Sequence, residues 1–397
     1  MRRGAARTLP AIAAVVVAAC GGRSDAPSPK APTAAPAPTT APAPAPPAPE
    51  VVAAALTPMQ LAGQMVVGAF RASGPAIPAA LRRAIGAGAV GGVILFRENG
   101  DTVREAAAIT HRLRAIRRPA ALRRFPLLVM VDQEGGAVRR LADAAPVRDA
   151  DAQARSGPGA AWTSGRRAAA ALRRAGINVN LAPVADVAVP TGFLRVQRRS
   201  YGGDPAAVAQ LAAWFARGSA RGGVAATAKH FPGLGRAARS TDDGRVVVEA
   251  PLDALRAVDE RPFRDLVAAG DVDLVMVANA VYPALDARPA VFSSRVVTGE
   301  LRGRLGFGGV VITDDLEARS LAEGYGGPGA RAIAAVGAGA DLVLYGARTA
   351  SALRARHALT AAIAAGRVAR PRAVAAVARI LELRARLAAA RASGRLR

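Results

Sequence analysis

Short apolar runs alternate with Ala- and Arg-rich amphipathic segments from about residue 52 onward. Each run is four to eight residues long, rich in Val and Leu, and continuous rather than alternating, which is typical of parallel strands covered on both faces. The runs occupy residues 64–70, 90–96, 126–132, 177–184, 224–230, 272–279, 309–315 and 340–346. Eight such strands with helices between them predict an α/β fold, a closed (β/α)8 TIM-type barrel.

The alternative to a barrel is an open, doubly wound sheet. A dinucleotide-binding sheet would carry a Gly-x-Gly-x-x-Gly sequence after its first strand, and none follows the first apolar run here. The tail, from about residue 348 to 397, has the pattern of two or three helices that close the barrel. We therefore predict one folded domain over residues 51–397.

The N-terminus has the pattern of a secretory signal peptide over residues 1–19. A basic MRRGAAR segment precedes the apolar LPAIAAVVVAA, which is too short to span a bilayer comfortably. The segment runs into Val17-Ala18-Ala19-Cys20, an order that resembles a bacterial lipobox and predicts cleavage before Cys20 and lipidation of its thiol. Because Cys20 is the single cysteine of the chain, the alternative is a small residue that follows a signal peptide by chance.

Residues 20–50 combine the lipidated Cys20 with a segment rich in Pro, Ala and Thr that offers almost nothing to bury. Such a segment is expected to extend by roughly 3 Å per residue as a tether. Together, these features predict a protein that is lipid-anchored to the outer face of a bacterial membrane, in the cell envelope.

The chain carries a formal net charge of +25, supplied almost entirely by Arg. Aromatic residues make up only 4% of the sequence, and no basic run is interleaved with them, so we expect no nucleic-acid partner. A compositional bias toward Ala, Arg, Gly and Pro accounts for the charge, which also favours loose attraction to an acidic envelope.

Catalytic groups of a barrel should follow the C-terminal ends of its strands. Few polar residues follow the first, second and eighth apolar runs. Polar residues do follow each of the third to seventh runs. The polar residues after those five runs are Asp132, Gln133, Glu134, Asn180, Asp186, Arg198, Arg199, Ser200, Tyr201, Lys229, His230, Asn279, Asp314 and Asp315. They are predicted to gather on one arc of the barrel, as a single cleft requires.

We expect neither a metal site nor a cofactor. The chain has three histidines, and His111 and His357 fall within helical patterns at the predicted surface. There is no His-Glu-x-x-His, paired-Cys, Walker A or Gly-x-Ser-x-Gly sequence. What remains is carboxylates around cationic groups, a set that suits glycoside hydrolysis. Glu134 and Asp315 taken alone would equally fit first-turn acids of helices, whereas Asp314 ends an apolar run.

Six segments, in this order, resemble the N-terminal catalytic barrel of glycoside hydrolase family three. They are VDQEGGAVRRL, INVNLAPVADV, RRSYGGDP, AKHFPGLG, MVANAVYPALD and GFGGVVITDDLEA. The similarity is greatest to the single-domain bacterial branch of β-N-acetylhexosaminidases that act on cell-wall sugars. It extends from LTPMQLAGQMVVGAF to the end of the chain, which is nearly the whole predicted domain.

The resemblance implies a retaining mechanism in which Asp314 is the nucleophile and forms a covalent glycosyl intermediate. Asp132 would bind sugar hydroxyls in the −1 subsite. The other sugar-contacting positions implied by the resemblance are Arg140, Arg199, Lys229 and His230. Lysine offers three donors to a hydroxyl-rich ligand, and Lys229 is one of two lysines in the chain.

The sequence departs from the family in the loop after Lys229-His230. The branch that it resembles has a His where this chain has Leu234, and an Asp-Ser-His where it has Ser240-Thr241-Asp242. That last His, paired with its Asp, is the family's general acid/base, and both are absent here. Asn279 also stands where the family commonly has His.

Three interpretations follow. In the first, Asp242 or its neighbour Asp243 is the acid/base, which requires a raised pKa. In the second, Asp314 works without a protein acid and the enzyme prefers activated leaving groups. In the third, the chain is a non-catalytic, glycan-binding lipoprotein. We adopt the first, with Asp242 as acid/base and a β-linked N-acetylhexosamine of peptidoglycan or another envelope glycan as the carbohydrate substrate.

Overall fold

The computed structural model describes residues 47–71 and 75–393, together with Ala18 and Gly21. The chain divides into two units, Met1–Pro46 and Pro47–Arg397. Apart from Ala18, Gly21 and residues 47–50, the predicted signal peptide, Cys20 and the predicted tether lie outside the described residues. Helix α1 (Pro49–Ala55) takes up the last two positions assigned to that tether.

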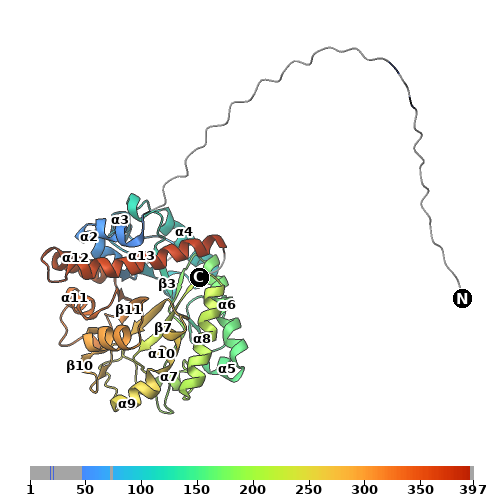
Figure 1. Cartoon of the computed structure of the whole chain (residues 1–397), viewed down its shortest axis with the longest axis vertical. Coiled ribbons are helices and arrows are strands. Elements are labelled where there is room, and N and C mark those ends of the chain that lie inside the picture. The colour runs from blue at the N-terminus through green and yellow to red at the C-terminus, as the bar shows by residue number, and fades with distance from the viewer. Residues whose placement is uncertain (1–17, 19–20, 22–46, 72–74, 394–397) are drawn as a thin grey trace. The chain divides into compact units, whose positions relative to one another are not determined.

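Eight parallel strands form a closed barrel at the centre of the second unit (Figure 1). They are β1 (Val66–Gly68), β2 (Gly92–Ile94), β3 (Leu128–Val131), β6 (Val179–Asn180), β7 (Ala225–Phe231), β8 (Leu274–Val277), β11 (Val310–Asp315) and β12 (Leu342–Tyr345). Each lies within one of the eight apolar runs, except that β7 extends one residue beyond its run. Val66 of β1 pairs in parallel with Val343 of β12, which closes the sheet and shows that the open-sheet alternative is wrong.

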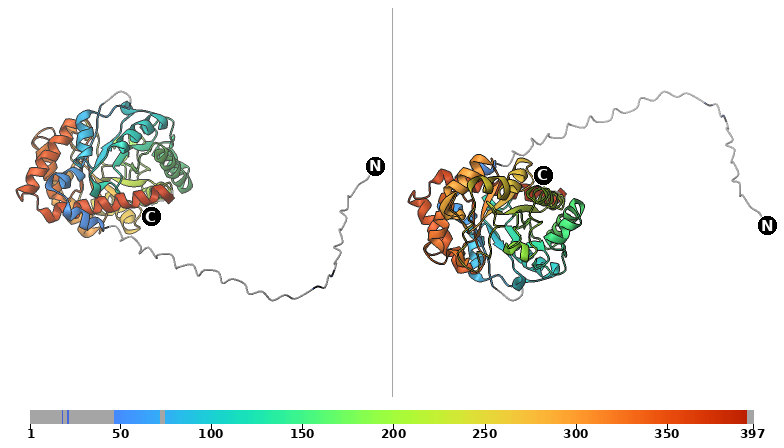
Figure 2. Two further views of the ribbon diagram at one scale, coloured as in Figure 1. Left: turned by 90° about the horizontal axis from the view of Figure 1, so that it is seen from above. Right: turned by 90° about the horizontal axis from the view of Figure 1, so that it is seen from below.

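Helices surround the strands, as the views from above and below show (Figure 2). They are α2 (Pro58–Gln64), α3 (Ala79–Gly86), α4 (Val103–Ala115), α5 (Ala150–Arg155), α6 (Pro158–Arg174), α7 (Phe193–Val196), α8 (Pro205–Arg221), α9 (Leu252–Ala254), α10 (Arg261–Ala268), α11 (Pro328–Ala338), α12 (Thr349–Ala364) and α13 (Arg370–Ser393), with a π-helical segment at Arg295–Arg304. The strands are therefore covered on their outer face, and their continuous hydrophobicity follows from that burial. The barrel prediction is confirmed.

Two glycines allow α6 and α8 to pack closely. A Cβ atom on Gly165 of α6 would lie 2.1 Å from the carbonyl oxygen of Phe215, and one on Gly218 of α8 would lie 2.2 Å from that of Trp162. Neither position could accept a larger residue without moving a helix backbone.

Helix α13 lies across the N-terminal ends of the barrel strands. Its fully buried Arg384 donates to the carbonyl oxygens of Phe125, at 2.8 Å, and Pro126, at 2.5 Å, just before β3. Arg384 also donates to the side-chain oxygen of Gln64, at the end of α2. The predicted closing helices are thus α12 and α13, and α13 seals the end of the barrel opposite the polar strand ends.

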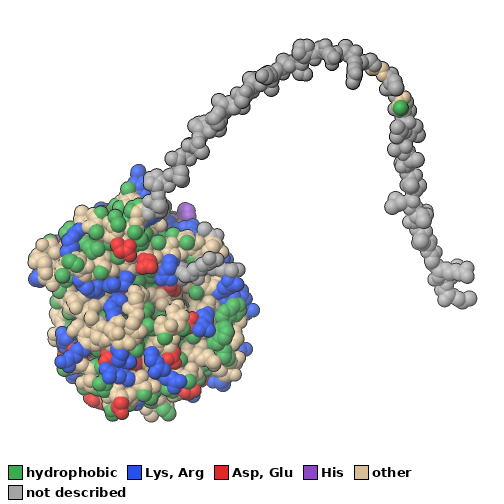
Figure 3. Space-filling view, viewed as in Figure 1, with side chains coloured by type: hydrophobic (Ala, Val, Ile, Leu, Met, Phe, Trp, Pro, Cys, Tyr) green, Lys and Arg blue, Asp and Glu red, His purple; other side chains and the backbone are tan. Residues whose placement is uncertain are grey.

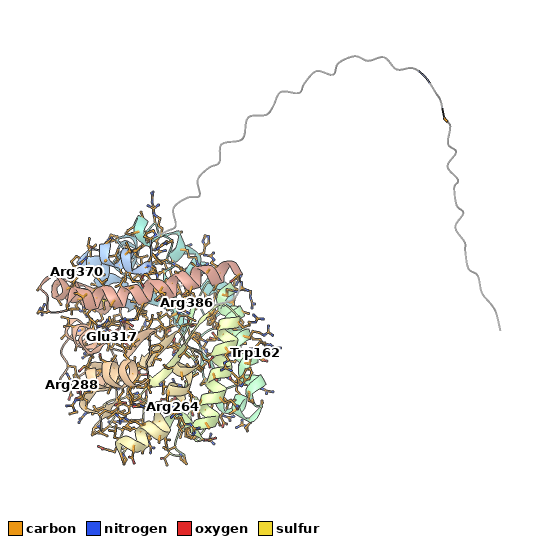
Figure 4. The ribbon with its side chains drawn as sticks, in the orientation of Figure 1. Trp162, Arg264, Arg288, Glu317, Arg370 and Arg386 are labelled. Carbon is orange, nitrogen blue, oxygen red and sulfur yellow. The ribbon has the colours of Figure 1, made fainter. Side chains whose placement is uncertain are left out.

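Ion pairs hold α13 at the same end. Arg379 and Arg372 lie 2.8 Å and 3.4 Å from the buried carboxylate of Asp341, which precedes β12. Arg386, labelled in Figure 4, lies 2.7 Å from Asp273, which precedes β8.

Two hairpins that the sequence did not predict extend from the other end of the barrel. They are β4 (Gln133–Gly135) with β5 (Val138–Arg139), after β3, and β9 (Val281–Tyr282) with β10 (Asp286–Pro289), after β8. None of the described helices combines the length and the apolar character needed to cross a membrane.

Candidate active site

A cavity of about 160 Å³ opens at the C-terminal ends of the barrel strands. All seven residues to which the sequence assigned a catalytic or sugar-binding role line this cavity: Asp132, Arg140, Arg199, Lys229, His230, Asp242 and Asp314. They come from the ends of β3, β7 and β11 and from the connections that follow β3, β6 and β7. The fold therefore brings together side chains that are up to 182 residues apart in the sequence.

A network of two carboxylates and two cations lies at one side of the cavity. The Lys229 ammonium is 2.6 Å from Asp132 Oδ1 and 2.6 Å from Glu134 Oε1. The Arg199 guanidinium donates from Nε to Glu134 Oε2 and from Nη2 to Glu134 Oε1, both at 2.9 Å. Lys229 and Glu134 are buried, so each charge depends on the others for stabilisation.

Burial opposes charge in this network, and the neighbouring charges outweigh it. Burial alone would raise the pKa of Glu134, but the charges of Arg199 and Lys229 and their hydrogen bonds hold that pKa well below its usual range. Burial alone would lower the pKa of Lys229, and the carboxylates of Asp132 and Glu134 raise it instead. Glu134, Lys229 and Arg199 are therefore ionised at neutral pH, and the two cations present fixed charges to the cavity.

His230 is oriented by a buried aspartate. Its ring Nδ1 lies 2.8 Å from Asp186 Oδ2, and its backbone N–H donates to the same carboxylate at 3.2 Å. The backbone N–H of Leu234 donates to Asp186 Oδ1 at 2.6 Å. Asp186 thus binds both the end of β7, where the Lys229–His230 peptide bond is cis, and Leu234 in the turn that follows.

Apolar and aromatic groups complete the wall on the side of β2 and β12. Ile94 and Phe96 follow from β2, and Leu344 and Gly346 from β12. The Arg140 guanidinium lies 5.5 Å from the centre of the Phe96 ring, and its Nη2 lies 4.0 Å from Asp132 Oδ2. The strands that supply few polar residues therefore supply packing surface.

Asp314 lies at the end of β11, where its Oδ1 accepts a hydrogen bond of 2.8 Å from the Asp315 backbone N–H. The Asp315 carboxylate accepts from the backbone N–H groups of Glu317 and Gly346, both at 2.9 Å. Burial, supported by the charges of Asp314 and Glu317, raises the pKa of Asp315 to about 7 against those hydrogen bonds. The buried Asn279 donates to the Asp315 carbonyl oxygen at 2.7 Å. Asp314 is thus held in place by its own strand end and faces the cavity.

Asp242 lies in the loop after β7, at the rim of the cavity. Its backbone N–H donates to Ser240 Oγ at 3.1 Å, and its side chain is solvent-accessible. Asp243, the alternative acid/base, is exposed and is not among the described residues that line the cavity. The structure therefore separates two neighbours that the sequence left equivalent.

The pKa of Asp242 is raised above its ordinary value. The first cause is the surrounding protein, which removes part of its hydration, and the second is the negative charge of Asp314. The charges of His230 and Arg199 oppose the rise. Asp242 and Asp314 thus interact electrostatically across the cavity, and Asp242 holds its proton more tightly than an ordinary aspartate.

Two positions in the loop that differs from the family pattern are filled by packed residues. Leu234 is 2% exposed and lines the cavity. Thr241 is 3% exposed, and its carbonyl oxygen accepts a 3.0 Å hydrogen bond from the backbone N–H of Ser320. Within residues 47–71 and 75–393, no three His, Asp or Glu side chains are grouped so that they could hold a metal ion.

A family comparison agrees with the resemblance seen in the sequence. The model of the glycosyl hydrolase family 3 N-terminal domain matches residues 60–383, most of the chain. The chain belongs to glycoside hydrolase family 3. A fungal relative from Arthroderma benhamiae, described as an uncharacterized secreted glycosyl hydrolase, is 39% identical over 300 residues, which are 73% of this chain and 82% of the relative.

Two solved family 3 structures match the barrel. The β-N-acetylhexosaminidase from Beutenbergia cavernae superposes with a TM-score of 0.75 at 33% identity, over 83% of this chain and 99% of that one. The family 3 β-N-acetylglucosaminidase from a Paenibacillus species gives a TM-score of 0.76 at 36% identity. That match covers 84% of this chain but 63% of the Paenibacillus chain, so this chain spans less than two thirds of that protein.

Glu134 and Asp186 are the site residues to which the sequence assigned no role. Glu134 joins Arg199 to Lys229, and Asp186 orients His230. Each lies two residues after the end of an apolar run, which was the available signal. Their partners lie 44 to 95 residues away in the sequence, so only the closed barrel reveals the pairing.

Proposed function

We propose that this glycoside hydrolase is a retaining β-N-acetylhexosaminidase in which Asp314 is the nucleophile and Asp242 is the general acid/base. The observation that carries the proposal is the cavity at the C-terminal end of the barrel, which both carboxylates line together with Arg199 and Lys229. The names of the Beutenbergia and Paenibacillus relatives support the N-acetylhexosamine specificity.

In the first step, Asp314 attacks the anomeric carbon while Asp242 gives its proton to the glycosidic oxygen, and the leaving sugar departs as an alcohol. In the second step, Asp242, now ionised, takes a proton from water, and the resulting hydroxide displaces Asp314. Two inversions give net retention. The raised pKa of Asp242 supports the acid role, because a general acid must carry its proton at the working pH.

The remaining five residues bind the sugar in this proposal. Asp132 accepts hydrogen bonds from sugar hydroxyls, and its ion pair with Lys229 holds that carboxylate in position. Arg140 and Arg199 donate to hydroxyl or N-acetyl oxygens, and His230 donates or accepts from the ring nitrogen that Asp186 leaves free. Small changes in position would be costly, since catalysis depends on alignment of the two carboxylates with the substrate.

The test is a panel of glycosides: an aryl β-N-acetylglucosaminide, a chitobioside and a muropeptide. We expect turnover of the aryl compound and of at least one natural glycoside, abolished in Asp314→Asn. Asp243→Asn is the matched control, because it removes the same charge next to Asp242 but outside the cavity lining, and it should retain activity within about threefold.

The panel separates the three interpretations of the altered loop. Turnover of the aryl compound alone would mean that no protein acid operates, since an activated leaving group departs without protonation. Saturable sugar binding without turnover of any glycoside would favour the glycan-binding lipoprotein and overturn the enzymatic proposal.

We also propose that the protein is lipid-anchored through Cys20 to the outer face of a bacterial membrane and acts on peptidoglycan or another envelope glycan. The lipobox-like Val17-Ala18-Ala19-Cys20 order supports the anchor, and the description of one relative as secreted supports export. Expressed in a bacterium, the chain should fractionate with membranes and carry a diacylglycerol mass on Cys20, and Cys20→Ser should be released. Equal release of both proteins would contradict the anchor.

A further inference from the structure

A second and larger cavity, of about 610 Å³, lies at the other end of the barrel. It is bounded by the segments that lead into β3, β6 and β7, by the C-terminal ends of α4 and α6, and by the last turns of α13. Figure 1 shows the C-terminal end of α13 beside α6. The catalytic cavity opens at the C-terminal strand ends, so the two cavities are separated by the barrel core.

Arginines dominate the lining of this second cavity, which we call the arginine cavity. The lining includes no Asp or Glu and no aromatic residue among the described residues. Its arginines are Arg114, Arg118, Arg123, Arg124, Arg173, Arg174 and Arg391. In the part of the chain that the structure describes, none of the seven has a carboxylate within ion-pairing distance.

Arg-rich composition alone does not account for this arrangement. Arginine and lysine side chains are spread among acidic ones over the face shown in Figure 3. At the same end of the barrel, Asp341 alone pairs with Arg302, Arg372 and Arg379. Carboxylates therefore neutralise other arginines at this end of the barrel, but no carboxylate lines the arginine cavity among the described residues.

Two of the seven arginines, Arg114 and Arg118, are held in place by backbone carbonyl oxygens. Arg118 Nη1 donates to the carbonyl oxygen of Phe125 at 2.6 Å, and Arg114 Nη2 donates to that of Gly176 at 2.7 Å. Burial lowers the pKa of both arginines, and for Arg114 the charge of Arg391 adds to the effect. The positive charges thus destabilise one another in the free protein, and a bound anion would relieve that cost.

We propose that the arginine cavity binds a phosphate-bearing anion. Guanidinium groups match phosphate oxygens in pairs, and several converging on one cavity can neutralise a doubly charged group. Two sources share this chemistry, a soluble diphosphate and the headgroup of an anionic phospholipid. The absence of an aromatic residue from the described lining argues against single-stranded nucleic acid, whose bases bind by stacking on such rings.

The first residue of the folded unit, Pro47, lies beside this cavity. Arg124, one of the seven arginines, donates to the carbonyl oxygen of Pro47, the first residue of the unit. A phospholipid headgroup would therefore be bound beside Pro47, at which the folded unit begins. The proposal does not depend on the glycosidase assignment, because the two cavities share no residue.

The test compares two triple variants of the full chain, both in a Cys20→Ser background so that no acyl chain contributes. In the cavity variant, Arg173, Arg174 and Arg391 become Gln; the structure shows no hydrogen bond or ion pair for these side chains among the described residues. In the control variant, the exposed Arg83, Arg104 and Arg367 become Gln, which removes the same net charge elsewhere on the surface.

Binding is measured by calorimetry with inorganic pyrophosphate and by flotation with phosphatidylglycerol vesicles, with phosphatidylcholine vesicles as reference. We expect the cavity variant to bind at least tenfold more weakly than the parent, and the control variant to stay within about twofold. Pyrophosphate binding alone assigns a soluble phosphate, vesicle binding alone assigns a lipid headgroup, and both support the proposal. Hydrolase activity and melting temperature show that each variant is folded.

Three results would overturn the proposal. The first is no binding of either probe by the parent. The second is an equal loss in both variants, which would reduce the effect to net charge. The third is binding of a single-stranded oligonucleotide with no binding of pyrophosphate or vesicles.

Discussion

Replacing Glu134 with Gln tests the buried charge network directly. The substitution keeps the shape of the side chain but removes the charge that joins Arg199 to Lys229. Removing one partner of a buried ion pair typically costs about 3 to 5 kcal/mol. Because Asp132 still pairs with Lys229, at 2.6 Å, we expect a loss of about 3 kcal/mol at pH 7, at the lower end of that range.

The same variant makes a prediction about pH. The network lowers the pKa of Glu134 in the folded protein, so its stabilisation is complete above the unfolded pKa and is lost as the pH falls toward the folded pKa. Glutamine does not titrate. An unfolded glutamate has a pKa of about 4.3, so the difference in unfolding free energy between parent and variant should shrink by about 1.8 kcal/mol between pH 7 and pH 3.

Urea unfolding at pH 7 and pH 3 measures both quantities. Glu98→Gln is the matched control, because Glu98 and Arg71 are paired at 2.7 Å but are 61% and 54% exposed. An exposed pair contributes about 1 kcal/mol or less. The reasoning is refuted if Glu134→Gln costs no more than Glu98→Gln, or if its cost is the same at both pH values.

Two further predictions concern the acid/base. Asp242→Ala should lower kcat/KM for a chitobioside by about 10² to 10⁴ but far less for a dinitrophenyl glycoside, whose leaving group needs no proton, while Asp243→Ala should change neither rate by more than about threefold. Equal losses on both substrates, or a larger effect at Asp243, would exclude Asp242 as the acid. Asp314→Asn should lower the pKa of Asp242, measured by carboxyl NMR titration. Burial is the largest cause of the raised pKa of Asp242, and the negative charge of Asp314 is the second. An unchanged pKa would show that the two carboxylates do not interact.

The barrel could be predicted from the sequence because its strands are buried on both faces. Runs such as LVMV at Leu128–Val131 and again at Leu274–Val277 are fully buried, so hydrophobicity marked them without ambiguity. The role of α13 could not be predicted in this way. Its Arg384 is fully buried and donates to carbonyl oxygens that no sequence pattern identifies.

The candidate site was predictable where a side chain lies at the C-terminal end of a strand, as Lys229 and Asp314 do. It was not predictable where function depends on the path of a loop. Asp242 and Asp243 have equivalent sequence contexts, and only the turn anchored by Ser240 brings the first to the cavity and leaves the second outside its lining. The carboxylate partners Glu134 and Asp186 likewise emerge only when distant strand ends meet.

The central claim, that Asp314 forms a covalent intermediate which Asp242 helps to hydrolyse, is tested most directly by trapping. In Asp242→Ala, an aryl β-N-acetylglucosaminide should still glycosylate the enzyme, whereas hydrolysis of the intermediate should be slow because water lacks its base. Peptide mass spectrometry should then find one N-acetylhexosamine on the peptide that contains Asp314, and none in Asp242→Ala/Asp314→Asn. A sugar on another residue, or a product of inverted configuration with no adduct, would contradict the account.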